Sequence, residues 1–317
     1  MTRTAVLALA VSALAFEASA QTPAPAVART KEGHPDLQGI WEGRWTTPLE
    51  RPPQAPALAL TAEQAAGMMA AMETGRRARP VNSNPDSDFD MVGLARVKGE
   101  YRSSLIVDPA DGRLPLTEEG RALRTRFARE LSDNPEERMA SERCVGGPGR
   151  APMHTVPTNS YMRIIQAPGH VVLHTEAIDD VRILPLGGRH GPDAMLDLQG
   201  DSIARWEGDT LVVETKNFRA DDPFRFSPPV SVVFLSAATT VTERITRVSD
   251  SEIVYTYTVT DPVLYTRPWT VETSFIRTNA RMFEYACHEA NYSLTNILRG
   301  ARLLEERAAK AAKKGKP

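Results

Sequence analysis

Candidates for chemistry are concentrated in the second half of the chain, where histidines and carboxylates recur along predicted strands. A carboxylate and a histidine that face one pocket can abstract a proton, and an arginine beside them can position an anionic or carbonyl-bearing ligand. We therefore expect a small-molecule enzyme that works by acid–base catalysis without an organic cofactor, of the lyase, isomerase or hydrolase type. Its predicted proton-transfer groups are Glu176 and His288, and Asp201 is predicted as a catalytic group that orients them.

Four more side chains are predicted to bind the substrate: His174, Arg182, His190 and Arg267. His174 lies two residues before Glu176 on a predicted strand, so both side chains would project from the same face. Each of the four also has a structural interpretation. Arginines at strand ends commonly form ion pairs, and a polar strand face often meets only solvent.

A catalytic zinc site would need three protein ligands and an open fourth position. His174, Glu176 and either His190 or His288 could supply the ligands, but no His-x-His pair supports such a site. His170 and His174 stand four residues apart, which on a strand separates them by roughly 13 Å, too far to share one ion. We therefore assign no metal.

Motifs for organic cofactors and for serine hydrolysis do not fit either. The glycine-rich stretch Cys144–Gly149 lacks the spacing and the following lysine of a phosphate-binding loop, so it is interpreted as a turn. Gly200-Asp201-Ser202 precedes a predicted strand, whereas a nucleophile elbow precedes a helix. These patterns leave acid–base chemistry as the leading prediction.

The two cysteines of the chain, Cys144 and Cys287, are predicted to form a disulfide, because an exported protein meets an oxidising compartment. A bridge over so long a loop would stabilise the fold by roughly 4–5 kcal/mol in the chain-entropy model. The alternative is a catalytic thiolate, whose pKa Arg143 or His288 would lower.

The first 20 residues are typical of a signal peptide. Arg3 provides a positive start, Ala5–Phe16 is apolar but too short to span a bilayer, and Ala18-Ser19-Ala20 matches the cleavage pattern. No later run predicts a transmembrane segment. We therefore expect a periplasmic or secreted protein, cleaved at about Ala20, with a flexible Pro/Ala-rich leader over residues 21–35.

The overall composition is that of a globular protein, with 41% hydrophobic residues, 25% charged residues and a net charge of -2. The basic run Lys310–Lys316 is explained by a solvated helix end, so no nucleic-acid partner is predicted. The expected partner is a small-molecule ligand or substrate.

From Tyr161 onward the hydrophobic pattern changes to a period of two. Nine candidate strands then follow one another without helices, which predicts a mainly β protein with an antiparallel, barrel-like meander of the lipocalin or calycin type. The candidate strands are 161–166, 170–176, 181–185, 202–206, 210–215, 238–248, 253–260, 269–277 and 282–288.

The predicted domain is a single mainly-β unit over residues 36–300, with helical and loop embellishments at 57–135. The embellishments include a helix from Thr61 to Thr74 that opens with a capping box, and a hairpin that turns on Asp111-Gly112. A second helix begins at Thr117 and ends by Ser132. A C-terminal helix over 296–312 leads into a basic helical tail at 301–317.

Several motifs support a family resemblance: Ser104–Arg113, Gly200-Asp201-Ser202 with Trp206-Glu207-Gly208-Asp209-Thr210-Leu211-Val212-Val213, Asn217-Phe218, Thr266–Thr270 and Glu284–Glu289. Together they resemble a widespread, largely uncharacterised family of exported proteins from sphingomonads, myxobacteria and soil acidobacteria. The resemblance spans the mature chain and implies export, but it implies no particular activity. Separately, Gly39-x-Trp41 is similar to the short lipocalin signature.

Two other classes of function remain open. One is a lipocalin-like periplasmic carrier that binds a small hydrophobic or aromatic ligand without catalysis, and the other is a structural envelope protein. The enzyme predicts that Glu176, Asp201 and His288 converge in one cavity. The carrier predicts an apolar cavity with few titratable groups.

Overall fold

The computed structural model describes residues 27–78, 93–130, 133–156, 158–219, 224–227, 231–289 and 291–314. The predicted signal peptide, its cleavage site and the first part of the leader lie outside the described residues, as does part of the stretch predicted as helical and loop embellishments, at 79–92. No helix in the described part of the chain combines the length and the apolar character needed to cross a membrane.

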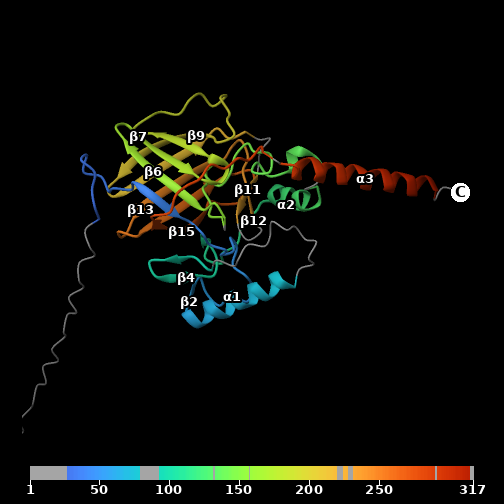
Figure 1. The fold of residues 1–317 in the computed structure, drawn as a ribbon, viewed down its shortest axis with the longest axis horizontal. Helices are drawn as coiled ribbons and strands as arrows, with labels where there is room; N and C mark the ends of the chain where they lie inside the picture. The colour runs from blue at the N-terminus through green and yellow to red at the C-terminus, as the bar shows by residue number, and fades with distance from the viewer. Residues whose placement is uncertain are drawn as a thin grey trace, which may run out of the picture.

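A large antiparallel sheet forms the body of the protein (Figure 1). Its strand order is β8-β7-β6-β1-β15-β14-β13-β10-β9, and β5 pairs with β15 beside this path. The strands are β1 (Gly39–Glu42), β5 (Ile106–Asp108), β6 (Tyr161–Ala167), β7 (His170–Thr175), β8 (Val181–Pro185), β9 (Asp201–Glu207), β10 (Thr210–Lys216), β13 (Thr240–Arg247), β14 (Glu252–Thr260) and β15 (Trp269–Thr278).

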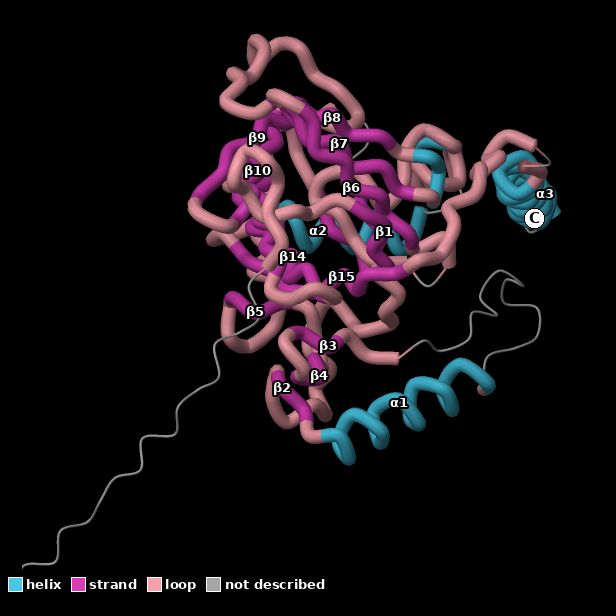
Figure 2. The backbone as a smooth tube through the Cα atoms, turned by 60° about the vertical axis from the view of Figure 1, so that its left-hand side comes forward, coloured by secondary structure: helices cyan, strands magenta, loops and turns pink. Residues whose placement is uncertain are grey.

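Two meanders therefore meet at β1, the first strand of the chain. One meander is β6-β7-β8 and the other is β9-β10-β13-β14-β15, and β1 lies between β6 and β15 (Figure 2). In its register Trp41 lies opposite Met162 on one side and Arg277 on the other. Trp41 is fully buried and its indole N–H donates to the Leu37 carbonyl at 2.8 Å, so this short strand is anchored in the core.

The strands form because their apolar residues alternate with polar ones, as the period of two predicts. In β13, Val241, Glu243, Ile245 and Arg247 are buried, while the residues between them are less buried or exposed. One face of the sheet is thus an inner face that carries two charged side chains among apolar ones. These charges must find partners inside the protein.

The inner face is covered by chain segments from outside the sheet. Met153, Leu49 and Phe234 are buried against it in one hydrophobic cluster together with Trp269 and Tyr255. Side chains from several connecting segments therefore pack against the inner face of the sheet.

The two edge strands of the sheet meet at one point. Leu186, just after β8, forms a single parallel bridge with Ala204 of β9, and the Gly187 amide donates to the Ala204 carbonyl at 2.9 Å. Along the described residues these edges form no continuous ladder, so the mainly β, antiparallel architecture is confirmed and a closed barrel is not.

Three short strands and a helix form a separate layer below the large sheet (Figure 1). The strands are β2 (Ala59–Leu60), β3 (Arg96–Val97) and β4 (Glu100–Arg102), and helix α1 spans Ala62–Arg77. The predicted capping box is present, because the Thr61 and Gln64 side chains each accept a hydrogen bond from the backbone amide of the other, at 3.2 and 2.9 Å.

The remaining elements are helix α2 (Glu118–Glu130), the 3-10 turns η2 (Pro135–Glu137) and η3 (Ala177–Asp179), the hairpin β11 (Phe224–Ser227) and β12 (Ser231–Phe234), and helix α3 (Ser293–Lys314). Helix α2 begins where predicted, with the Thr117 hydroxyl accepting from the Gly120 amide at 3.1 Å. Helix α3 projects away from the sheet (Figure 1) and begins earlier than predicted.

Three predictions about local structure are wrong. Residues 282–288 form no strand, and the place beside β15 that the next strand of a meander would take is occupied by β1. The segment around Asp111-Gly112 turns, but it does not close a hairpin, since β5 pairs with β15. Residues 28–35 of the predicted leader are folded, with Thr30 N donating to His34 O at 2.8 Å.

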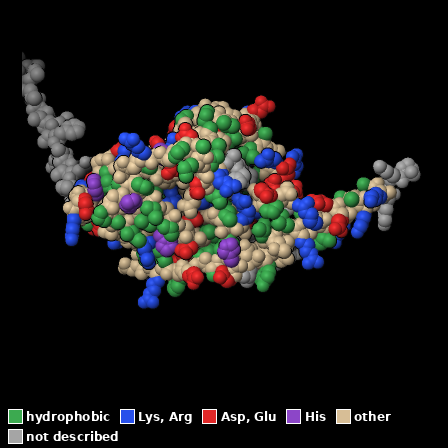
Figure 3. Space-filling model, turned by 90° about the horizontal axis from the view of Figure 1, so that it is seen from above, with side chains coloured by type: hydrophobic (Ala, Val, Ile, Leu, Met, Phe, Trp, Pro, Cys, Tyr) green, Lys and Arg blue, Asp and Glu red, His purple; other side chains and the backbone are tan. Residues whose placement is uncertain are grey.

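In the space-filling view, lysine and arginine side chains are interspersed with aspartate and glutamate over the visible face (Figure 3). This arrangement agrees with the small net charge of -2.

Candidate functional site

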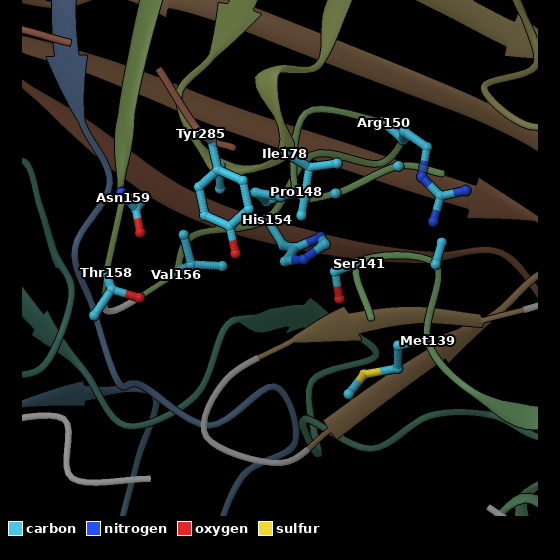
Figure 4. Close-up of a pocket in the computed structure, with 14 residues that line it drawn as sticks. Met139, Ser141, Pro148, Arg150, His154, Val156, Thr158, Asn159, Ile178 and Tyr285 are labelled. Atoms are coloured by element: carbon cyan, nitrogen blue, oxygen red, sulfur yellow. The ribbon is translucent and has the colours of Figure 1, made fainter. Parts of the chain in front are cut away.

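A cavity of about 140 Å³ lies where the glycine-rich turn, the segment after it and the C-terminal segment meet. Figure 4 shows side chains from all three segments around it. The lining residues are Met139, Ala140, Ser141, Gly146, Gly147, Pro148, Arg150, His154, Val156, Thr158, Asn159, Ala177, Ile178 and Tyr285. We call this space the His154 cavity.

The glycine-rich turn can lie here only because its glycines carry no side chain. A Cβ on Gly147 would lie 2.7 Å from Cγ1 of Ile178, and one on Gly149 would lie 2.5 Å from the Thr175 hydroxyl. Real Cβ atoms do not approach other heavy atoms this closely, so the sequence Gly-Gly-Pro-Gly permits the close approach of the turn to β7 and η3.

His154 lines the cavity, and in the view of Figure 4 its ring is drawn between the Tyr285 ring and Ser141. Its backbone amide donates to the Pro148 carbonyl at 3.2 Å, which fixes the residue against the turn. Arg150, which is 3% exposed, lies at one side and donates to the Leu198 carbonyl at 3.4 Å. Residues that carry an imidazole, a phenol, an aliphatic hydroxyl and a guanidinium thus line one small space.

Two residues that line the cavity have left-handed backbone conformations. Asn159 has φ 48°, and Ile178 has φ 62° with ψ 5°. Asparagine adopts this region readily, but a β-branched residue there is strained. Strain of this kind persists only where surrounding contacts enforce it, and it is concentrated at functional sites.

The C-terminal wall of the cavity is attached covalently to the turn. Cys144 and Cys287 form the predicted disulfide, with their Cα atoms 5.7 Å apart, and no free cysteine remains. The side-chain amide of Asn291 donates a further hydrogen bond to the Glu142 carbonyl at 3.0 Å. These links hold Tyr285 against the segment that carries Ser141.

Glu176, predicted as a proton-transfer group, lies directly behind this cavity. It is 4% exposed and accepts hydrogen bonds from the Asn159 side chain at 2.8 Å and from the Phe283 amide at 3.1 Å. It follows β7 and precedes η3, so the predicted shared strand face with His174 is wrong. Its carboxylate thus connects Asn159, which lines the cavity, with the segment that leads to Tyr285.

Arg182, predicted to bind substrate, lies on the other side of the glycine-rich turn and is buried. Its guanidinium donates to both carboxylate oxygens of Glu243, at 3.1 and 2.6 Å, and to the Gly149 carbonyl at 3.4 Å. The Tyr255 hydroxyl donates to Glu243 at 2.7 Å, and the Met153 amide donates to that hydroxyl at 2.8 Å. This buried network therefore fixes the glycine-rich turn through the Gly149 carbonyl and the segment after it through the Met153 amide.

Burial and charge shift the titration of this network. Burial opposes the charged form of Arg182, but the ion pair with Glu243 outweighs that effect and raises the pKa of Arg182. Burial, reinforced by the Glu243 charge, raises the pKa of Tyr255 well above its usual value. Burial also raises the pKa of Asp180, whose carboxylate accepts from the Gly147 amide at 2.6 Å.

His190 and Asp201, both predicted site residues, are brought together in a second cluster. Nδ1 of His190 lies 3.0 Å from Asp201, and Nε2 lies 3.1 Å from Glu214. Asp201 also accepts from the Gly191 amide at 2.7 Å. Only a doubly protonated imidazole carries two N–H donors, so the neutral ring can donate to one of these carboxylates at a time.

The other predicted residues make separate contacts. His174 Nε2 lies 2.6 Å from Asp179, and Arg267 forms an ion pair with Asp108 at 2.7 Å. His288 is exposed and follows Cys287 in an irregular segment. Both partners of the Arg267 pair are about half exposed, so the structural interpretation, an ion pair at the end of a strand, fits Arg267.

The three predicted catalytic residues therefore contact three different sets of neighbours. Glu176 accepts from the Asn159 side chain and the Phe283 backbone amide. Asp201 contacts His190. The backbone carbonyl of His288 accepts from the backbone amide of Asn291 at 3.3 Å. Within the described residues, no three His, Cys, Asp or Glu side chains are grouped so as to hold a metal ion.

Sequence reasoning missed His154, Arg150 and Tyr285, which line the cavity. His154 stands in an irregular segment, where no periodicity tells which way a side chain points. The one available signal was the glycine-rich turn just before it, since such a turn lets backbone approach closely and loops of this kind often carry function.

A scan of the chain against models of known protein families finds no match, and a search among curated proteins finds none either. The functional interpretation of the site therefore rests on its geometry.

Proposed function

We propose that the protein is an enzyme that performs cofactor-free acid–base catalysis on a small organic molecule in the His154 cavity. The observation that carries the proposal is the convergence of His154, Arg150 and Tyr285 on one cavity bordered by strained backbone at Ile178. The expected reaction class stays that of a lyase, isomerase or hydrolase, while the site moves from Glu176, Asp201 and His288 to this cavity.

Each group has a role that follows from its chemistry. The His154 imidazole abstracts a proton from carbon next to a carbonyl or carboxylate group, and the guanidinium of Arg150 attracts the oxygen on which negative charge develops. The Tyr285 hydroxyl returns a proton to the substrate or to a leaving group. The substrate loses one proton to His154 and gains one from Tyr285, and the cycle closes when solvent water carries the proton of the imidazolium back to the tyrosinate.

The cavity size limits the substrate. A cavity of about 150 Å³ in a protein core binds a molecule of the size of benzene, and the His154 cavity measures about 140 Å³. The arginine favours a carboxylate or carbonyl group on that molecule. We therefore propose a small organic acid or carbonyl compound as the substrate class.

We further propose that the mature chain works in the periplasm or outside the cell, as a member of the exported family that its motifs resemble. The disulfide supports this location, since such bonds persist in oxidising compartments. The meeting of the sheet edges at Leu186 and Ala204 supports a barrel-like body for the domain.

A hydrogen–deuterium exchange assay tests the proposal without knowledge of the product. The disulfide-bonded protein is incubated in D2O with a panel of small carboxylic acids and ketones, and proton NMR follows the loss of C–H signals. We expect exchange into at least one compound, slowed about 100-fold or more by His154→Gln, since a positioned base contributes 10²–10⁴-fold.

Matched variants make the assay specific. Tyr285→Phe removes the hydroxyl in the cavity, and Tyr292→Phe removes one from a side chain that is 71% exposed and does not line it. Only the first should slow turnover. Absence of exchange in the whole panel, or full exchange by the folded His154→Gln variant, would overturn the proposal.

A further inference from the structure

A second and larger cavity lies at the other end of β6 and β7, away from the glycine-rich turn. It measures about 410 Å³, within the range of small-molecule sites. It is lined by the turn at 29–36, by Gln38, by the connection 166–171 between β6 and β7, and by Leu186 and Trp206. We call it the Trp206 cavity.

The turn that covers this cavity is held by specific contacts. Arg29 forms an ion pair with Asp209 through two hydrogen bonds of 2.9 and 2.8 Å. The Gln166 amide group accepts from the Leu37 amide at 2.7 Å and donates to the Pro35 carbonyl at 3.1 Å. The wall of the cavity is thus fixed to β6 on one side and to the β9–β10 turn on the other.

The most specific feature of the lining is an aromatic pair. His34 from the turn stacks on Trp206 of β9, with ring centroids 4.6 Å apart and an angle of 6° between the planes. Both side chains line the cavity, and Val171 and Leu186 add apolar surface beside them. Flat aromatic surfaces favour stacked or edge-on contact with another ring, worth about 0.5–1.5 kcal/mol beyond area burial.

Charged side chains of both signs line the cavity. Lys31 stands against Glu32 and Asp36 on the same turn, while the charge of Arg29 is paired with Asp209. Because no positive charge prevails, the lining gives no reason to favour an anion over a neutral molecule. Gln38 is among the residues that line the cavity, and a glutamine side chain can hydrogen-bond a hydroxyl group.

From these observations we infer that the Trp206 cavity is a binding site for a neutral, planar aromatic compound that carries a hydroxyl group. The ring packs against the His34–Trp206 pair, and the hydroxyl points to the polar rim at Gln38. This site is separate from the His154 cavity and does not depend on catalysis there.

Binding of 2-naphthol, measured by isothermal titration calorimetry on the full mature chain, tests the inference. We expect saturable binding of one molecule per chain, weakened about tenfold in Trp206→Leu, which corresponds to about 1.4 kcal/mol. His34→Ala should weaken it as well, and this change lies in a surface turn that the core does not need. Phe283→Leu is the matched control, since it alters an aromatic ring that is 70% exposed and does not line the cavity.

Three results would overturn the inference. One is the lack of saturable binding up to the solubility of 2-naphthol. Another is equal affinity of the wild type and the folded His34→Ala variant, which would place the probe elsewhere. The third is tighter binding of naphthalene-2-carboxylate than of 2-naphthol, which would show that the site selects an anion.

Discussion

Arg182 and Glu243 form an ion pair inside the protein, with 2.6 Å between Nη2 and Oε2 and side chains that are 3% and 0% exposed. Arg182 belongs to β8 at one edge of the sheet, and Glu243 belongs to β13 near the other edge. The pair therefore connects the two meanders across the inner face, below the turn that borders the His154 cavity.

Removal of one partner should be costly, because the other charge stays buried without compensation. We predict that Arg182→Met lowers the free energy of unfolding by about 3–5 kcal/mol, measured by urea denaturation. Arg205→Met breaks the exposed pair with Glu207 and should cost no more than about 1 kcal/mol. Equal effects of the two changes would show that the buried pair has no special role.

Glu176 provides a second prediction, which separates a positioning role from a catalytic one. Glu176→Ala removes the acceptor of the Phe283 amide and the Asn159 side chain, at a cost of about 1–3 kcal/mol. It should also speed proteolysis between residues 279 and 289. Glu176→Gln keeps an acceptor and should retain most activity in the exchange assay. Loss of activity in a fully stable Glu176→Gln protein would restore the catalytic role predicted from the sequence.

The disulfide should stabilise both the fold and the His154 cavity. It joins cysteines 143 residues apart, so the chain-entropy model predicts a loss of about 5 kcal/mol in the Cys144→Ser, Cys287→Ser double variant. The measurement is urea denaturation without reductant. The same variant should lose exchange activity under conditions where it is still folded, since Tyr285 is no longer held. A folded variant with full activity would contradict the proposed role of that wall.

Asp180 makes stability depend on pH in a defined direction. Burial raises its pKa above the ordinary 3.8, although the Gly147 amide and nearby arginines oppose the shift. The folded protein thus binds this proton more tightly than the unfolded chain does. The resulting stabilisation is complete below pH 3.8 and is lost as the pH rises through the folded pKa.

Asp180→Asn mimics the protonated side chain and should remove this dependence. We expect the unfolding free energy of the wild type to fall relative to that of the variant as the pH rises from about 4 to about 7. Urea denaturation at several pH values gives the difference. A constant difference, or one that changes in the opposite direction, would show that Asp180 does not titrate in this way.

The strands were largely predictable, because their signal is local. Val181–Pro185 has the predicted bounds, and seven other strands differ by one or two residues at their ends. The failure at residues 282–288 has a non-local cause: alternation shows that a segment can form a strand, but not whether an edge is free to pair with it. The insertion of β1 between β6 and β15 could not be predicted for the same reason.

The candidate site was less predictable, because it is built from segments without periodicity. The pairing of Cys144 with Cys287 followed from their number and the expected compartment. His190 and Asp201 were both selected, and they do meet. The orientation of His154 instead depends on how the turn at Gly146–Gly149 packs, which is decided by contacts with β7 and η3 that no local pattern shows.

The position of β1 between β6 and β15 has a consequence for synthesis. Trp41 lies opposite Arg277 in the ladder, so the growing chain exposes one edge of β1 until almost the whole domain has been made. An unpaired edge with a hydrophobic face is a template for pairing with other chains. We therefore expect nascent chains to depend on holding chaperones, and C-terminal truncations that remove β15 to aggregate instead of forming a smaller domain.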